Sequence, residues 1–189
     1  TYKDFHPNVS KPHRLLENIN WHQTLTILYS FSKAYRMTGH RVGALLTSHE
    51  NLLEVEKVLD TFTVCPPQLG QYAANWGLVN LEAWTSDRRA EILERAKHFS
   101  KKFQPLSEAG WSLRGCGAYF AFVGHPFQEG SETLAPLILR DQGILLMPGT
   151  MFYPKYDPHG SRTFRIAFAN IDKNKITTLL ERLKNLSYQ

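Results

Sequence analysis

The sequence predicts an α/β fold in two parts joined by a long helix. Short β-branched and aromatic runs alternate with stretches whose apolar residues repeat at helical spacing along the 189 residues. One helical pattern is long enough to connect two lobes, and the order of elements changes after it. We therefore expect an α/β part over residues 1–85, a connecting helix over 86–104 and a smaller α+β domain over 105–189.

The first part contains two predicted strands, at residues 25–29 and 42–47. Only about a dozen residues separate them, which is marginal for a crossover between parallel neighbours, so we expect one strand to run antiparallel to its sheet. Thr47 and Glu50 form a capping-box signal, and apolar residues then repeat at helical spacing through Phe62. A helix is therefore expected after the second strand.

Two further helices precede the smaller domain. Pro66 and Pro67 break the chain, and the mixture of polar and apolar residues over 68–81 suggests the first of these helices. Ser86 can cap the long connecting helix, and Pro105 can end it. The apolar face of the connecting helix consists of Ile92, Leu93, Ala96, Phe99 and Phe103.

Beyond Gly110 the pattern reads strand, helix, strand, strand, helix. The strands are expected at residues 117–123, 144–147 and 163–169, because these runs are apolar, aromatic or β-branched. This order of elements is typical of an α+β domain.

The two helices of the smaller domain carry boundary signals. Ser131 or Thr133 is expected to cap the first, which ends before Gly143. The second begins near Asp172. Its apolar face consists of Ile176, Leu179, Leu180, Leu183 and Leu186.

Composition and charge exclude several classes of function. Lysine and arginine total 22 against 17 acidic residues, a net charge of +5, but their scatter favours a solvated surface over a nucleic-acid interface. A membrane protein is excluded because no apolar run reaches the roughly 18 residues of a membrane-spanning helix. Cys65, Cys116 and the histidines match no metal-ligand spacing, and two cysteines do not make a disulfide scaffold. We expect a reducing, cytoplasmic setting and no bound metal.

The densest polar cluster, residues 30–43, directly follows the first predicted strand. Its hydroxyls, cations and two glycines could hold an anion such as a phosphate, although composition alone favours a solvated basic loop. Lys33 has a second possible use. A lysine at the end of a buried strand and beside other cations can act as a neutral amine and form a Schiff base with a carbonyl.

The cluster also carries a motif: Ser30-Phe31-Ser32-Lys33 is followed by Met37-Thr38-Gly39, then by Arg41 and Gly43. This pattern resembles the cofactor-attachment motif of class I/II pyridoxal-phosphate aminotransferases of fold type I. Four later stretches resemble further family motifs in the same order: residues 65–72, 117–122, 146–149 and 164–169. The resemblance covers nearly the whole chain but only the carboxy-terminal half of a family member.

The resemblance implies pyridoxal 5'-phosphate as the cofactor and Lys33 as its Schiff-base lysine and proton shuttle. It makes Arg165 the residue that binds the substrate α-carboxylate, for which a planar guanidinium is suited and lysine is not. The other implied cofactor contacts are Tyr2 at the phenolic oxygen, and Ser30, Ser32 and Arg41 at the phosphate.

The resemblance further implies an intact homodimeric enzyme that transfers an amino group from an amino acid to a 2-oxo acid. The chain opens on Thr1-Tyr2 without an initiator Met or a signal peptide. We therefore expect a fragment that begins inside a longer protein, with residues 1–85 ending the large cofactor-binding domain, and that is inactive alone. Two alternatives stay open: a lyase or decarboxylase on the same fold, and an aminotransferase-like sensor domain of a GntR-type transcriptional regulator.

Overall fold

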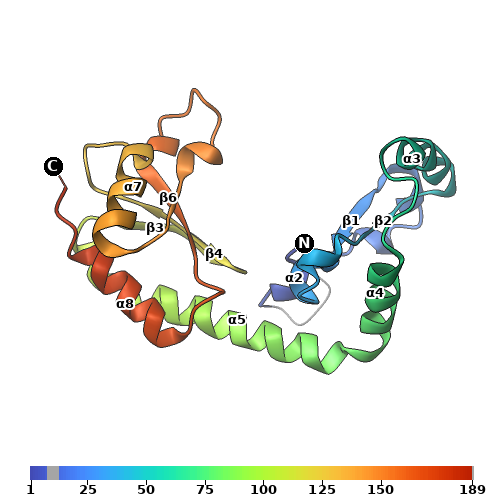
Figure 1. The fold of residues 1–189 in the computed structure, drawn as a ribbon, viewed down its shortest axis with the longest axis horizontal. Coiled ribbons are helices and arrows are strands. Elements are labelled where there is room, and N and C mark those ends of the chain that lie inside the picture. The colour runs from blue at the N-terminus through green and yellow to red at the C-terminus, as the bar shows by residue number, and fades with distance from the viewer. Residues whose placement is uncertain (8–12, 189) are drawn as a thin grey trace. The chain divides into compact units, whose positions relative to one another are not determined.

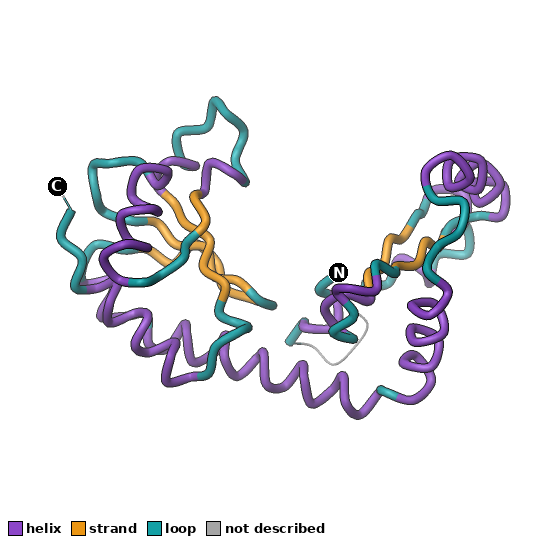
Figure 2. Tube along the Cα trace, in the orientation of Figure 1, coloured by secondary structure: helices purple, strands orange, loops and turns teal. Residues whose placement is uncertain are grey.

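The computed structural model describes residues 1–7 and 13–188. The chain divides into two compact units, Thr1–Ala90 and Glu91–Gln189, and helix α5 (Glu82–Lys102) contains the boundary between them. Each unit has a β-sheet of its own, and helices occupy most of the remaining chain (Figures 1 and 2). The predicted α/β fold is confirmed.

The sheet of the first unit consists of β1 (Ile27–Ser30) and β2 (Gly43–Leu46). The two strands pair antiparallel, with Ser30 opposite Gly43, as the short connection between them predicted. The connection contains the one-turn helix α2 (Phe31–Ala34) and the 3-10 helix η3 (Thr38–His40). Phe31, Met37 and Ala74 form the buried core of this corner.

The other helices of the first unit are η1 (Lys3–Phe5), η2 (Leu15–Glu17), α1 (Trp21–Thr24), α3 (His49–Phe62) and α4 (Gln68–Asn80). The prediction that Thr47 caps α3 is wrong by one residue. Ser48 is the cap, since its side chain accepts a hydrogen bond from the Asn51 backbone N–H at 3.2 Å. Thr47 is instead buried at the end of β2, where its hydroxyl lies 2.9 Å from that of Thr26.

The predicted boundaries of α5 also need correction. The helix begins at Glu82, so Ser86 lies inside it and is not its cap. The backbone carbonyl of Leu81 already accepts the N–H of Thr85 at 2.9 Å, and the acidic Glu82 favours a helix N-terminus. Pro105 lies in the first turn of α6 (Gln104–Glu108), a position where its missing N–H costs nothing.

The second unit has a four-stranded antiparallel sheet with the order β3-β4-β6-β5. Its strands are β3 (Ser112–Gly117), β4 (Phe120–Gly124), β5 (Met147–Pro148) and β6 (Thr163–Ala167). The single strand predicted over 117–123 is wrong, because a tight turn at Ala118, with φ of 47°, divides this region into a hairpin. The strand predicted at 144–147 starts only at Met147.

Helices α7 (Ser131–Gln142) and α8 (Lys173–Lys184) complete the second unit. Gly143, with φ of 66°, ends α7, and Asp172 caps α8 by accepting the Lys175 N–H at 2.8 Å, both as predicted. The cap of α7 is Gly130, whereas the predicted cap Ser131 is buried and donates to the Gly160 carbonyl at 3.2 Å.

One face of this sheet forms the main hydrophobic core. In this core, side chains of α5, α7 and α8 pack with those of β4 and β6. The fully buried strand residues alternate along the chain, as the two-residue period of a strand requires: Ala121, Val123, Phe164 and Ile166. The intervening residues, among them Arg165, therefore lie on the opposite face. None of the helices in the described ranges is long and apolar enough to cross a membrane.

Candidate functional site

Three of the predicted site residues lie where β1 turns into α2. Ser30 ends the strand and caps the helix, since its side chain accepts the Ser32 N–H at 3.3 Å. Phe31 is buried in the core, which fixes this single helical turn, whereas Ser32 and Lys33 are only partly buried. The local sequence thus places two hydroxyls and an amine at one strand end.

Arg41 returns to the same end of the strand pair. It lies two residues before Gly43, the partner of Ser30 in the sheet. Its backbone is left-handed, with φ of 51°, and its Nη1 donates to the Thr38 carbonyl at 2.9 Å. A Cβ at Gly43 would lie 2.8 Å from the Tyr29 carbonyl oxygen, so this close strand approach requires glycine.

Tyr2 directly precedes the 3-10 helix η1, and two residues of η1 contact Tyr29 on β1. The hydroxyl of Tyr29 donates to Asp4 Oδ2 at 2.8 Å, and Lys3 Nζ lies 4.9 Å from the centre of the Tyr29 ring. Burial, reinforced by the neighbouring Asp4 carboxylate, raises the pKa of Tyr29 above its ordinary value. Sequence reasoning missed the Asp4–Tyr29 pair, for which no local spacing gives a signal.

Arg165 lies on the outer face of the sheet in the second unit. Its Cζ is 4.3 Å from the centre of the Phe120 ring and 4.5 Å from that of Phe152. Nη2 lies 2.7 Å from Met147 Sδ, and the buried Nε has no hydrogen-bond partner in the described part of the chain. Sequence reasoning found the arginine but missed these three neighbours. Strand register brings two of them close, because it pairs Arg165 with Met147 and with Phe122, which shares its face of β4 with Phe120; the sequence alone does not specify this register.

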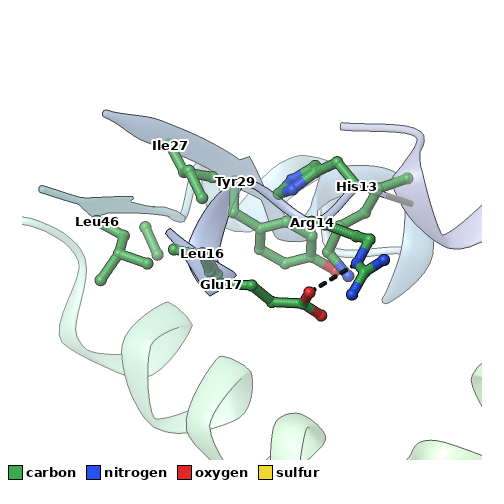
Figure 3. Close-up of a pocket in the computed structure, with 9 residues that line it drawn as sticks. His13, Arg14, Leu16, Glu17, Ile27, Tyr29 and Leu46 are labelled. Atoms are coloured by element: carbon green, nitrogen blue, oxygen red, sulfur yellow. Dashed lines mark hydrogen bonds and ion pairs between the residues drawn. The ribbon is translucent and has the colours of Figure 1, made fainter. Parts of the chain in front are cut away.

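A separate pocket of about 430 Å³ lies in the first unit (Figure 3). Its walls are mostly apolar and include Leu16, Ile27 and Tyr29, with the Arg14–Glu17 ion pair at 2.6 Å beside them. None of the predicted site residues is among the described residues that line it. Across residues 1–7 and 13–188, no group of three or more His, Cys, Asp or Glu side chains could hold a metal ion.

Comparison with known proteins identifies the fold and the family. Residues 1–183 match the family model described as aminotransferase class I and II. The (5-formylfuran-3-yl)methyl phosphate transaminase of Methanocaldococcus jannaschii is 29% identical over 163 residues, which cover 84% of this chain and 40% of that protein. The valine–pyruvate aminotransferase of Mycobacterium tuberculosis is 30% identical over 150 residues, which cover 76% of this chain and 36% of that protein.

Solved structures agree at the level of the fold. An aminotransferase from Staphylococcus aureus superposes with a TM-score of 0.81 at 22% identity, covering 97% of this chain and 47% of that one. The α-aminoadipate aminotransferase of Thermus thermophilus, complexed with N-(5'-phosphopyridoxyl)-L-leucine, superposes with a TM-score of 0.82 at 21% identity, again covering 97% of this chain and 47% of that one. The chain thus spans less than half the length of these relatives. With its family model matched over residues 1–183, the chain belongs to the class I and II aminotransferase family.

Proposed function

We propose that the intact protein transfers an amino group from an amino acid to a 2-oxo acid, with pyridoxal 5'-phosphate as its cofactor. The observation that carries the proposal is the family match over residues 1–183, with Lys33 directly after the Ser30–Ser32 cap at the end of β1. The names of two relatives, a transaminase and a valine–pyruvate aminotransferase, support the same type of reaction.

The donor groups at the end of the β1–β2 pair fit this cofactor chemically. Ser30, Ser32 and Arg41 offer two hydroxyls and a guanidinium, which suit a phosphate dianion. Lys33 offers the primary amine that an aldehyde requires. The pairing of Ser30 with Gly43 keeps the serine and arginine parts of this set at the same strand end.

When bound, pyridoxal phosphate supplies an electron-withdrawing ring that makes the α-proton of an amino acid labile. Lys33 would hold the cofactor covalently through Nζ, and the same amine, once free, would move the α-proton of the substrate. Tyr2 would help to hold the cofactor by donating a hydrogen bond to its phenolic oxygen.

Arg165 binds the α-carboxylate that every amino acid and 2-oxo acid shares. Its planar guanidinium matches the two carboxylate oxygens, which a lysine ammonium does not. The buried Nε, without a hydrogen-bond partner among the described residues, is a donor that a carboxylate oxygen would satisfy.

The family resemblance also implies a domain organisation for the intact protein, and the cysteines bear on its cellular compartment. Residues 1–85 belong to the large cofactor-binding domain, 86–104 to the connecting helix and 105–189 to the small domain of a homodimeric enzyme, as the family resemblance implies. Cys65 and Cys116 are free thiols, which supports a reducing compartment such as the cytoplasm.

Borohydride trapping tests the central residue. The protein is incubated with pyridoxal phosphate, reduced and digested, and the modified peptide is mapped by mass spectrometry. We expect the adduct on Lys33, its loss in Lys33→Arg, and no change in Lys57→Arg, an exposed lysine on α3. An adduct on another lysine would overturn the assignment. Turnover that needs no 2-oxo acid would identify a lyase or decarboxylase instead.

A further inference from the structure

The guanidinium of Arg165 is flanked by two aromatic rings. The centres of the Phe120 and Phe152 rings lie 4.3 and 4.5 Å from its Cζ, well inside the roughly 6 Å within which a cation is attracted to an aromatic ring. Arg165 is itself only partly exposed, so this attraction is less weakened by water than at an open surface. We refer to Phe120 and Phe152 as the aromatic clamp.

The two rings of the clamp come from different elements. Phe120 begins β4, and the register of β4 with β6 pairs Phe122 with Arg165 and Phe120 with Ala167. Phe120 and Phe122 are two residues apart on one strand and therefore share the face that carries Arg165. Phe152 comes from the connection between β5 and β6, directly after the 3-10 helix η4 (Gly149–Met151).

Phe152 is held in place although its side chain is 44% exposed. A Cβ at Gly149 would lie 2.6 Å from the Gly160 carbonyl oxygen, so the two ends of this connection touch backbone to backbone. Thr150 donates to Glu132 on α7 at 2.7 Å, and the Phe152 N–H donates to the Gly149 carbonyl at 2.8 Å. The connection therefore presents Phe152 to Arg165 from a fixed backbone.

One edge of the guanidinium carries only a weak acceptor. Nε and Nη2 lie on the same edge, Nη2 is 2.7 Å from the Met147 sulfur, and Nε has no hydrogen-bond partner among the described residues. A thioether is a weak acceptor, whereas a carboxylate accepts two parallel hydrogen bonds from such an edge. A carboxylate would thus replace a poor partner and satisfy a buried donor.

We propose that Phe120 and Phe152 are positioning residues that fix the plane of Arg165, so that its Nε–Nη2 edge receives a carboxylate in place of the Met147 sulfur. This inference rests on the proposed role of Arg165. It adds which edge of the guanidinium binds the carboxylate and which side chains orient the guanidinium. The clamp limits the rotation of a long side chain before the ligand arrives, which reduces the entropy lost on binding.

Side-chain NMR of the purified protein tests this inference. The Arg165 Nε–Hε signal is assigned by its loss in Arg165→Lys, and its response to added pyruvate measures carboxylate binding. The variants are Phe152→Leu, the conservative Phe152→Tyr, and Tyr156→Leu as a matched control, since Tyr156 is an 89% exposed aromatic residue of the same connection. Backbone amide spectra report whether each variant keeps its fold.

We expect Phe152→Leu to reduce the ring-current shift of the Arg165 signal, to which Phe120 still contributes, and to weaken pyruvate binding up to about tenfold, a loss consistent with the entropy of ordering one long side chain. Phe152→Tyr should retain both properties, and Tyr156→Leu should change neither. Unchanged pyruvate affinity in a folded Phe152→Leu variant overturns the clamp. A wild-type signal that ignores pyruvate overturns the carboxylate role together with the clamp. Failure of Lys33 trapping with a normal pyruvate response overturns the cofactor proposal alone.

Discussion

The Tyr29 hydroxyl donates to the Asp4 carboxylate at 2.8 Å, which ties the first residues of the chain to the strand that ends at Ser30. Asp4 lies two residues after Tyr2, and Tyr29 directly precedes Ser30. The pair therefore sets the position of Tyr2 and the following helix η1 relative to the strand end at Ser30. Because the donor is partly buried, this hydrogen bond should contribute more to stability than an ion pair on the surface does.

Replacement of Asp4 by alanine is expected to destabilise the first unit. The lost bond is charge-assisted, so the free energy of unfolding should fall by about 1.5 kcal/mol. The pKa of Tyr29 should fall as well, while burial still keeps it above its ordinary value. Urea denaturation and phenolate absorbance measure the two effects. Asp60→Ala, an exposed carboxylate on α3, is the control, and equal stability losses in both variants would contradict the role given to Asp4.

Arg41 and Arg36 offer a matched comparison for phosphate binding. Both have positive φ, 51° and 54°, but Arg36 lies 5.9 Å from the Trp84 ring, whereas Arg41 returns to the end of β1. We expect Arg41→Ala to weaken pyridoxal phosphate binding about tenfold or more, since charge-assisted hydrogen bonds contribute roughly 1.5 to 3 kcal/mol. Arg36→Ala should have a much smaller effect. Fluorescence titration measures both affinities.

Pyridoxal without its phosphate provides the control for this comparison. If Arg41 acts on the phosphate, Arg41→Ala should leave the weak affinity for pyridoxal nearly unchanged. Equal losses for both ligands would indicate that the substitution distorts the β1–β2 connection instead of removing a phosphate contact.

Substitution of Arg165 by lysine separates substrate binding from cofactor binding. Lysine keeps the charge but loses the planar fork, so amino-acid affinity should fall at least tenfold, about 1.4 kcal/mol. The absorbance spectrum of the bound cofactor should stay normal, because the proposed cofactor contacts lie in the first unit. Spectral titration with an amino acid measures both quantities in one experiment. Release of the cofactor from the variant would show that the role of Arg165 is assigned wrongly.

The helices with strong end signals could be predicted from the sequence. Helix α8 has an acidic cap at Asp172 and a regular apolar face, and Gly143 marks the end of α7. The β3–β4 hairpin could not be predicted, because its turn residue Ala118 lies within an apolar run and belongs to no usual turn signature, although its φ is positive. Ser131 also has the residue type and position expected of a helix cap, but it is buried and its hydroxyl donates a hydrogen bond to the Gly160 carbonyl.

The same distinction holds for the candidate site. Ser30, Ser32, Lys33 and Arg41 lie within one short segment, so the sequence alone shows that they are neighbours, and their proposed roles come from the family resemblance. The partners of Arg165 are not close to it in the sequence. Met147, for example, is 18 residues away and is brought close by the pairing of β5 with β6. Asp4 and Tyr29 are 25 residues apart. Such contacts depend on sheet register and on the path of connections, which one sequence does not specify.

We expect His125 to make the stability of the second unit dependent on pH. The side chain is 5% exposed, its Nε2 lies 3.0 Å from the Ser161 carbonyl, and its Nδ1 has no hydrogen-bond partner among the described residues. Burial lowers the pKa of His125, and the charge of Arg162 acts in the same direction, while the Ser161 carbonyl opposes them. The neutral ring is therefore the form that the folded state favours.

The sign of the effect follows from proton uptake. Below the unfolded-state pKa of about 6.5, the unfolded chain binds a proton that the folded chain resists. The contribution of His125 to the free energy of unfolding should thus be constant above about pH 7.5 and fall with acidification, by at most about 1.4 kcal/mol per pH unit. His125→Gln keeps a donor for Ser161 but does not titrate, so its stability should fall less between pH 7.5 and 5. The exposed His22→Gln is the control, and urea denaturation followed by Trp111 fluorescence is the measurement, since that ring lies 6.3 Å from His125. Identical pH slopes in the wild-type protein and His125→Gln would show that His125 does not cause the acid sensitivity.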